Sequence, residues 1–384
     1  MPVFGVLEVL SFLAGVLIVL GTIGSAIRTL VLPRAVASRL SVFVGRRLVY
    51  RTLLKLSYRL DSYESKDRLL AYGAPLSLLA VLASWMLAFL VGFALLIWPF
   101  THATFLQSLR ESGSSLLTLG FAQQNRVGPT IMYLLAGFTG LVIVALQIAY
   151  LPVLYGAFNR RETLVTMLQS RAGAPAWGPE ILARAQLVNI TDELRHLYAE
   201  WERWSAEVME SHTTYTVLVW FRSPHPLRSW VVGLLSALDS AAMFHALAPS
   251  TAPPEARLFL RMGFTCLRSI ADVLGIPYDP DPFPDDPIEL TFEEFNSAVE
   301  RLKRSGFPME RSAEEAWPHF KGWRVNYESI AYTLADVVVA PPGPWSGPRT
   351  HLPNLAIVPQ RPANRTPEDR QEGQEKAGRS GWHA

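Results

Sequence analysis

The stretch that decides the fold is Phe105-Leu-Gln-Ser-Leu-Arg-Glu-Ser-Gly-Ser-Ser-Leu-Leu-Thr-Leu-Gly-Phe121, a short, polar segment that is able to form a helix. Uncharged apolar stretches, 76–100 and 130–155, lie on either side of it. Each of these is long enough to cross a bilayer, which takes about 20 helical residues, whereas the segment itself is not. Non-helical backbone at membrane depth is tolerated only when it is buried in protein or lines an aqueous cavity. The pattern therefore predicts a half-helix that dips into the membrane and returns as extended chain.

The end of this segment has residue types that suit a dehydrated cation. Stacked backbone carbonyls can replace the hydration shell of a cation if the chain is held extended. Thr118 offers a carbonyl and a hydroxyl, Gly120 permits backbone angles that a Cβ would oppose, and Phe121 is an aromatic residue that can brace the chain. The preceding half-helix would also direct its partial negative charge, about half an elementary charge, at the cavity below.

Residues 76–158 resemble the two-span pore module of the potassium-channel superfamily, as found in its prokaryotic two-span members. In this resemblance 76–100 is the outer helix, 103–123 the pore helix with the filter, and 130–158 the inner helix. The family's Thr-Val-Gly-Tyr core corresponds to Thr118, Leu119, Gly120 and Phe121. The resemblance implies a passive channel, not an enzyme, in which these four residues coordinate K⁺ or another monovalent cation without a cofactor. Because one filter segment cannot enclose an ion, it also implies a homotetramer.

Two positions depart from the family pattern. Family filters end in Gly-Tyr-Gly-Asp or Gly-Phe-Gly-Asp, whereas Ala122 and Gln123 follow Phe121 here. If the second glycine position is left-handed, alanine costs about 1 kcal/mol or more there in each subunit. Two interpretations remain open: a potassium or weakly selective cation channel, and a non-conducting, membrane-anchored sensor or scaffold that retains the pore-loop fold.

The composition supports an all-α integral membrane protein. Of the 384 residues, 50% are hydrophobic and 18% are charged, whereas about a quarter are charged in a soluble domain. Residues 1–33 are predicted to be a retained N-terminal span, because they lack a basic start and their apolar stretch exceeds the 7–15 residues usual for a signal peptide. The single cysteine, Cys266, excludes an intramolecular disulfide. The net charge of +2 gives no indication of a nucleic-acid partner.

The distribution of basic residues predicts the orientation in the cell membrane. The connector 34–75 contains nine Lys and Arg residues, and the loop 101–129 contains two. The positive-inside rule then places the connector and everything after Arg161 in the cytoplasm. The N-terminus and the loop 101–129 face outside, so the chain is predicted to span the membrane three times.

Four basic residues recur every fourth position within the connector, which places them on one side of a helix. This basic stripe consists of Arg47, Arg51, Lys55 and Arg59. A basic amphipathic helix at the cytoplasmic face can lie along anionic lipid. The alternative is a connector that is basic only to fix the topology.

The predicted inner helix contains four residues of interest. Gly137 and Gly140 are either bending points or positions of close helix packing. Gln147 is the most polar deep residue and a candidate for the cavity wall. Pro152 is a candidate kink at the cytoplasmic end.

The remainder of the chain predicts a helical cytoplasmic domain over 180–339, because its apolar residues return at intervals of three and four. Within it, 230–247 is apolar enough to be a buried or membrane-contacting helix, and is not interpreted as a fourth span. Residues 340–384, rich in Pro, Gly, Arg and Gln, are predicted to be disordered. No nucleotide-binding motif is found, so the ligand of this domain stays unidentified. Glu193, His196 and Glu200 share a helical face, but no second ligand helix accompanies them and no metal site is predicted.

Overall fold

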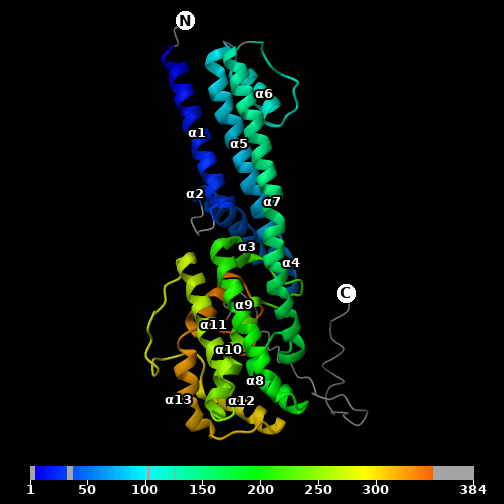
Figure 1. The fold of residues 1–384 in the computed structure, drawn as a ribbon, viewed down its shortest axis with the longest axis vertical. Helices are drawn as coiled ribbons and strands as arrows, with labels where there is room; N and C mark the ends of the chain where they lie inside the picture. The colour runs from blue at the N-terminus through cyan, green and yellow to red at the C-terminus, as the bar shows by residue number, and fades with distance from the viewer. Residues whose placement is uncertain (1–4, 33–37, 102–103, 126, 349–384) are drawn as a thin grey trace, which may run out of the picture. The chain divides into compact units, whose positions relative to one another are not determined.

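The computed structural model describes residues 5–32, 38–101, 104–125 and 127–348, and the regular elements of these residues are all helices (Figure 1). The predicted all-α class is thereby confirmed. In chain order the helices are α1 (Val6–Leu30), α2 (Arg39–Val42), the π-helix η1 (Phe43–Tyr50), α3 (Arg51–Ser57), α4 (Tyr63–Ala71), α5 (Gly73–Thr101), α6 (Phe105–Leu116), α7 (Val127–Ala172), α8 (Gly178–Leu187), η2 (Thr191–Glu193), α9 (Leu194–Thr214), η3 (Thr216–Trp220), α10 (Trp230–Leu247), α11 (Pro254–Leu274), α12 (Phe292–Ser305), α13 (Ala313–Arg324) and α14 (Glu328–Val337).

Among the described residues, four stretches are helical, long and apolar enough to cross a membrane. These are Val6–Leu30, Tyr63–Thr101, Val127–Ala172 and Trp230–Leu247. The first lies within the predicted N-terminal span 1–33, and the second and third contain the predicted spans 76–100 and 130–155. The chain thus has the make-up of a multi-pass membrane protein.

The chain forms two compact units. The first consists of Met1–Arg160 and Glu210–Arg222, and the second of Arg161–Met209 and Ser223–Ala384. Two predicted boundaries need correction. The inner helix does not end at 158, because α7 continues to Ala172, and the segment 210–222 belongs to the first unit although the prediction placed it in the helical domain.

In the first unit, α1, α5 and α7 run side by side and α6 packs beside α5 (Figure 1). The core between them is apolar and aromatic, with Trp85 and Phe89 of α5 fully buried. Trp85 also donates its indole N–H to the Ser25 hydroxyl of α1 at 2.9 Å. The N-terminal helix is therefore an integral part of this bundle.

The segment 210–222 packs within the first unit through both apolar and charged residues. Leu218 and Phe221 bury against Tyr150 and Leu154 of α7. Arg222 lies in an ion pair with the Asp67 carboxylate and donates to the Tyr63 hydroxyl at 2.9 Å. These partners are about 65 to 160 residues away in sequence, so no local pattern could have predicted the contact.

The second unit is built around α10. Every residue of α10 except His245 is buried, and α8, α11, α13 and α14 contact it. Of the two predicted roles for 230–247, this burial supports a core helix of the helical unit. An apolar helix surrounded on all sides by protein needs no polar face.

The second unit contains a buried cluster of charged side chains around Arg324. Arg324 lies 2.5 Å from the Asp239 carboxylate and 2.7 Å from that of Glu328. It also donates to the Trp345 carbonyl at 2.9 Å, and Trp345 is buried. The predicted start of the disordered tail at residue 340 is therefore wrong, because residues 340–348 pack into this unit. The remainder of that prediction, 349–384, lies outside the described residues.

Candidate functional site

The predicted half-helix is α6, which is 12 residues long. At 1.5 Å per residue this is about 18 Å, little more than half the thickness of the hydrocarbon layer. The Thr104 hydroxyl caps its start by accepting from the Gln107 N–H at 3.3 Å. Its buried face is polar: the Ser112 hydroxyl donates to the Leu90 carbonyl of α5 at 2.9 Å. Hydroxyl groups thus attach this short helix to the outer helix of the module.

The end of α6 packs directly on α7 at the two glycines of the inner helix. A Cβ at Gly140 would lie 2.0 Å from the Leu116 carbonyl oxygen, and one at Gly137 would lie 3.3 Å from that of Ser115. Helix α7 is continuous through both positions. The structure therefore favours close helix packing over bending as the role of these glycines, because a side chain at either position would meet the end of α6.

The other two candidates on the inner helix, Gln147 and Pro152, differ in exposure. Gln147 is only 7% exposed in the single chain, and its place in a cavity wall stays a prediction for the assembled protein. Pro152 is exposed, and α7 continues through it to Ala172. The helix tolerates this proline without ending there.

The chain after α6, the return segment, is irregular backbone. Several of its N–H groups are hydrogen-bonded to the end of α6, whereas its carbonyl groups from 117 to 121 are not hydrogen-bonded to the described residues. Thr118 and Gly120 have positive φ, 55° and 69°, whereas Leu119 and Phe121 are not among the positive-φ residues. The N–H groups of Leu119 and Gly120 donate to the Ser114 carbonyl at 2.8 and 3.2 Å. In contrast, the carbonyls from 117 to 121 accept no hydrogen bond from the described residues. The amides therefore point back at the pore helix, and the carbonyl oxygens stay available.

Ala122 does not carry the predicted strain. It is not among the positive-φ residues, and its N–H donates to the Ser114 hydroxyl at 3.0 Å. The non-glycine residue of this segment with a left-handed backbone is instead Thr118, where a side chain costs about 1 kcal/mol. Alanine at position 122 therefore fits the backbone without that cost.

The side chains of the return segment lie at the surface of the single chain. Leu119 and Phe121 are each 61% exposed. Within one chain the Phe121 ring is not packed on a core, so its bracing of the filter is a prediction for the assembled protein. A hollow of about 360 Å³, lined by Gln107, Arg110 and Ala122 among others, borders this segment.

Sequence reasoning missed the carboxylate that holds this region together. Glu111 of α6 is 2% exposed and accepts from the Gln124 amide at 2.9 Å and from the Tyr133 hydroxyl at 2.8 Å. It thereby connects α6, the return segment and α7. A lone carboxylate in a segment expected at membrane depth is a signal for such a role, because buried ionisable groups in membranes are rare and partnered.

The basic stripe is exposed at all four positions, across η1, α3 and the residues after it. The π-helical geometry of η1 does not turn Arg47 inward. On the opposite side of the connector, Val44 and Tyr50 are buried. The connector therefore has a buried and an exposed side, and the stripe lies on the exposed one.

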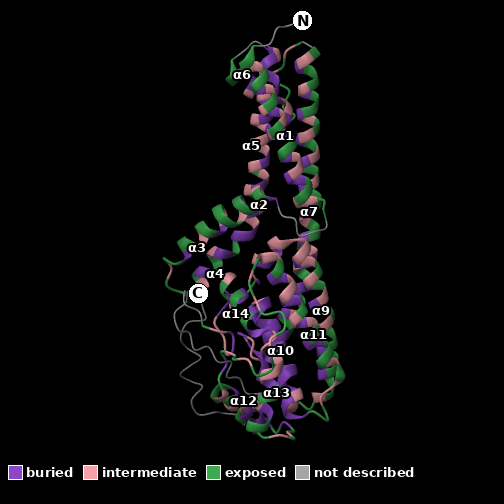
Figure 2. Cartoon of the chain, turned by 90° about the vertical axis from the view of Figure 1, so that its left-hand side faces the viewer, coloured by how far each residue is buried: buried purple, intermediate pink, exposed green. Residues whose placement is uncertain are grey.

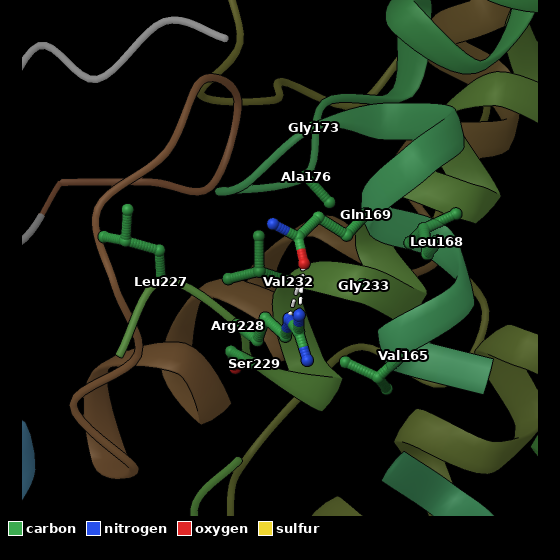
Figure 3. Close-up of a pocket in the computed structure, with 10 residues that line it drawn as sticks. All are labelled: Val165, Leu168, Gln169, Gly173, Ala176, Leu227, Arg228, Ser229, Val232 and Gly233. Atoms are coloured by element: carbon green, nitrogen blue, oxygen red, sulfur yellow. Dashed lines mark hydrogen bonds between the residues drawn. The ribbon is translucent and has the colours of Figure 1, made fainter. Parts of the chain in front are cut away.

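The second unit offers little room for a ligand at the cavity shown in Figure 3. Arg228 donates to the amide oxygen of Gln169, and both residues line this cavity. Arg228 also donates to the Thr166 hydroxyl at 3.1 Å. The enclosed volume is about 10 Å³, which is room for roughly one water molecule. Within the described residues, no three His, Cys, Asp or Glu side chains are grouped to hold a metal ion.

Fold and site together define the class: an all-helical chain with several membrane-spanning candidates and a half-helix between two of them. No protein-family model, no curated protein and no solved structure matches this chain.

Proposed function

We propose that four copies of this chain form a passive cation channel in the cell membrane. The permeant species is K⁺ or a weakly selected set of monovalent cations. The backbone oxygens of Thr118, Leu119, Gly120 and Phe121 serve as its coordinating groups. In this proposal the chain is a transport protein and not an enzyme.

The observation that carries the proposal is the one-sided polarity of the return segment. Its amides are engaged by Ser114 at the end of α6, and its carbonyls from 117 to 121 have no hydrogen-bond donor in the described residues. Unpaired carbonyls buried in a membrane are costly, whereas carbonyls facing a dehydrating cation are not. The adjoining polar hollow is the kind of aqueous space that irregular backbone at membrane depth requires.

Assembly into a tetramer accounts for the exposed side chains of the site. Along α7 a row of large apolar residues is exposed at intervals of three, four or seven, away from α5 and α6. The row comprises Ile131, Leu134, Phe138, Leu141 and Ile148. Together with Leu119 and Phe121, it supplies an apolar surface for neighbouring copies and lipid. The proposed arrangement has three spans, with the N-terminus outside and the helical unit in the cytoplasm.

The direct test is flux of K⁺ and Na⁺ into proteoliposomes that contain the full chain. Gly120→Asp is the informative variant, because it adds a charge to the filter, no atom lies within 4 Å of a Cβ at this position, and Asp is among the residues that best tolerate its left-handed backbone (φ 69°). Asn125→Asp is the matched control, since it adds the same charge to an exposed residue of the same segment outside the filter.

The expected result is flux that Gly120→Asp abolishes and Asn125→Asp retains. Unchanged flux in Gly120→Asp would eliminate the filter assignment. If the wild-type protein shows no flux above empty liposomes, the non-conducting sensor or scaffold becomes the better interpretation. Two features favour that alternative: Gln123 replaces the usual acidic anchor, and Arg110 brings a positive charge to the outer hollow.

A further inference from the structure

The proposed channel leaves the exposed face of the connector without a role. The basic stripe carries four positive charges, and none of its members takes part in an ion pair with the described residues. Large apolar side chains are exposed on the same connector: Phe43 (54%), Leu48 (56%), Leu56 (43%) and Tyr58 (54%). A connector that is basic only to fix topology does not need these apolar groups.

The other side of the connector fixes its position along α5. The Ser77 hydroxyl donates to the Gly45 carbonyl at 3.1 Å, and the ring of Tyr50 lies against Gly73. Ser77 is the second residue of the uncharged stretch 76–100. The connector therefore lies at the depth where the apolar span begins, and it runs obliquely to the bundle, with many exposed residues (Figure 2).

This depth suits both kinds of exposed side chain. Aromatic and aliphatic groups of an interfacial helix enter the boundary between headgroups and acyl chains, and basic groups beside them reach the headgroup phosphates. The leaflet that the predicted orientation gives to the connector is the one that carries the negative surface potential in cells. Charge and polarity are therefore complementary to an anionic bilayer surface.

We infer that the exposed face of η1 and α3 is a binding surface for the phosphate headgroups of anionic phospholipids in the adjacent leaflet. Arg47, Arg51, Lys55 and Arg59 bind the phosphates, and the four exposed apolar residues anchor the helix among the acyl chains. The inference uses the orientation of the chain but not ion conduction. A failure of this proposal therefore leaves the filter assignment untouched.

The inner side of the connector also packs against the segment 210–222, and this packing limits how far a bound lipid can displace the connector. Trp220 lies 6.1 Å from the Tyr50 ring, and the Arg46 guanidinium lies 5.8 Å from the Trp220 ring. These contacts join the connector to the segment 210–222. A lipid bound to the outer face thus contacts a helix whose inner face is already packed.

The test uses the full chain in detergent micelles that contain equal amounts of phosphatidylglycerol and phosphatidylcholine. Native mass spectrometry then measures which lipid stays bound. One variant replaces Arg47, Arg51, Lys55 and Arg59 by glutamine. The matched control replaces four exposed arginines of the helical unit by glutamine: Arg203, Arg257, Arg261 and Arg304.

The expected result is a preference of the wild-type protein for phosphatidylglycerol that the stripe variant loses by at least about tenfold and the control keeps. Wild-type preference in the stripe variant, or an equal loss in the control, overturns the proposal. If the stripe variant does not fold, a salt titration of the wild-type protein decides. The preference must fall between about 0.1 and about 1 M NaCl, and a preference independent of salt overturns the proposal.

Discussion

Single buried charges connect parts of the first unit that are far apart in the sequence. Glu111 accepts hydrogen bonds from the return segment and from α7, and Arg222 pairs with Asp67. Removing Asp67 from the Arg222–Asp67 pair leaves a charge without compensation, which typically costs about 3–5 kcal/mol. The partners of both residues cannot be identified from the sequence, because only the fold brings them together.

At the same scale, His245 makes the helical unit sensitive to acid. Burial, and next the positive charge of Arg257, lowers the pKa of His245 to about 4, from about 6.5 in an unfolded chain. Between these values the unfolded chain binds a proton that the folded chain does not. This histidine therefore lowers the stability of the fold as the pH falls from about 6.5 toward 4.

We expect His245→Phe to remove this contribution while keeping the ring beside Trp323. After a discount for partial exposure, the wild-type protein should lose on the order of 1 kcal/mol more than the variant between pH 7 and pH 5. Thermal unfolding at both pH values measures this difference. The exposed His196 provides the control, and an identical pH dependence of wild type and His245→Phe would refute the role of His245.

At the scale of elements, the position of α6 depends on its contact with α7. The Leu116 carbonyl occupies the space that a Cβ on residue 140 would need. The serines on the other side of α6 bond to α5, so the half-helix is held between the two long helices. A displacement of α6 would move the return segment, since Ser114 holds three of its amides.

We therefore expect Gly140→Ala to destabilise the first unit by about 1–3 kcal/mol, the usual cost of overpacking. It should also reduce any ion flux, because the return segment moves with α6. Gly21→Ala in α1 is the control, since no atom lies within 4 Å of its Cβ position. Thermal unfolding in detergent measures the effect, and equal stability of the two variants would show that α6 is not held in this way.

At the scale of the whole molecule, the proposed orientation assigns the return segment and the helical unit to opposite sides of the membrane. The native thiol gives little background for a labelling test, because Cys266 is buried and burial raises its pKa. Gln123 and Glu193 are exposed, and the proposed orientation assigns them to opposite sides.

We expect a membrane-impermeant maleimide to label Gln123→Cys in intact cells. It should label Glu193→Cys only after the membrane is permeabilised. The unmodified chain, with Cys266 alone, is the control for background. Labelling in the reverse pattern would invert the topology and, with it, the leaflet assigned to the basic stripe.

The sequence by itself determined the class of the protein and the order of its parts. Apolar stretches long enough to span predicted α1, α5 and α7, because hydrophobic length is a local property. The polar stretch between 105 and 121 predicted the half-helix for the same reason, and the spacing of Arg47, Arg51, Lys55 and Arg59 predicted one exposed face.

The tertiary structure decided what depends on partners far apart in the chain. In the tertiary structure Gly140 packs against the end of α6, Gln147 is buried, and the segment 210–222 belongs to the first unit. The fold also buries 340–348 through Arg324 and brings Gln124 and Tyr133 to Glu111. Whether a polar or small residue is a hinge, a cavity wall or a buried contact depends on the atoms that the fold brings to it, and a single sequence does not contain that information.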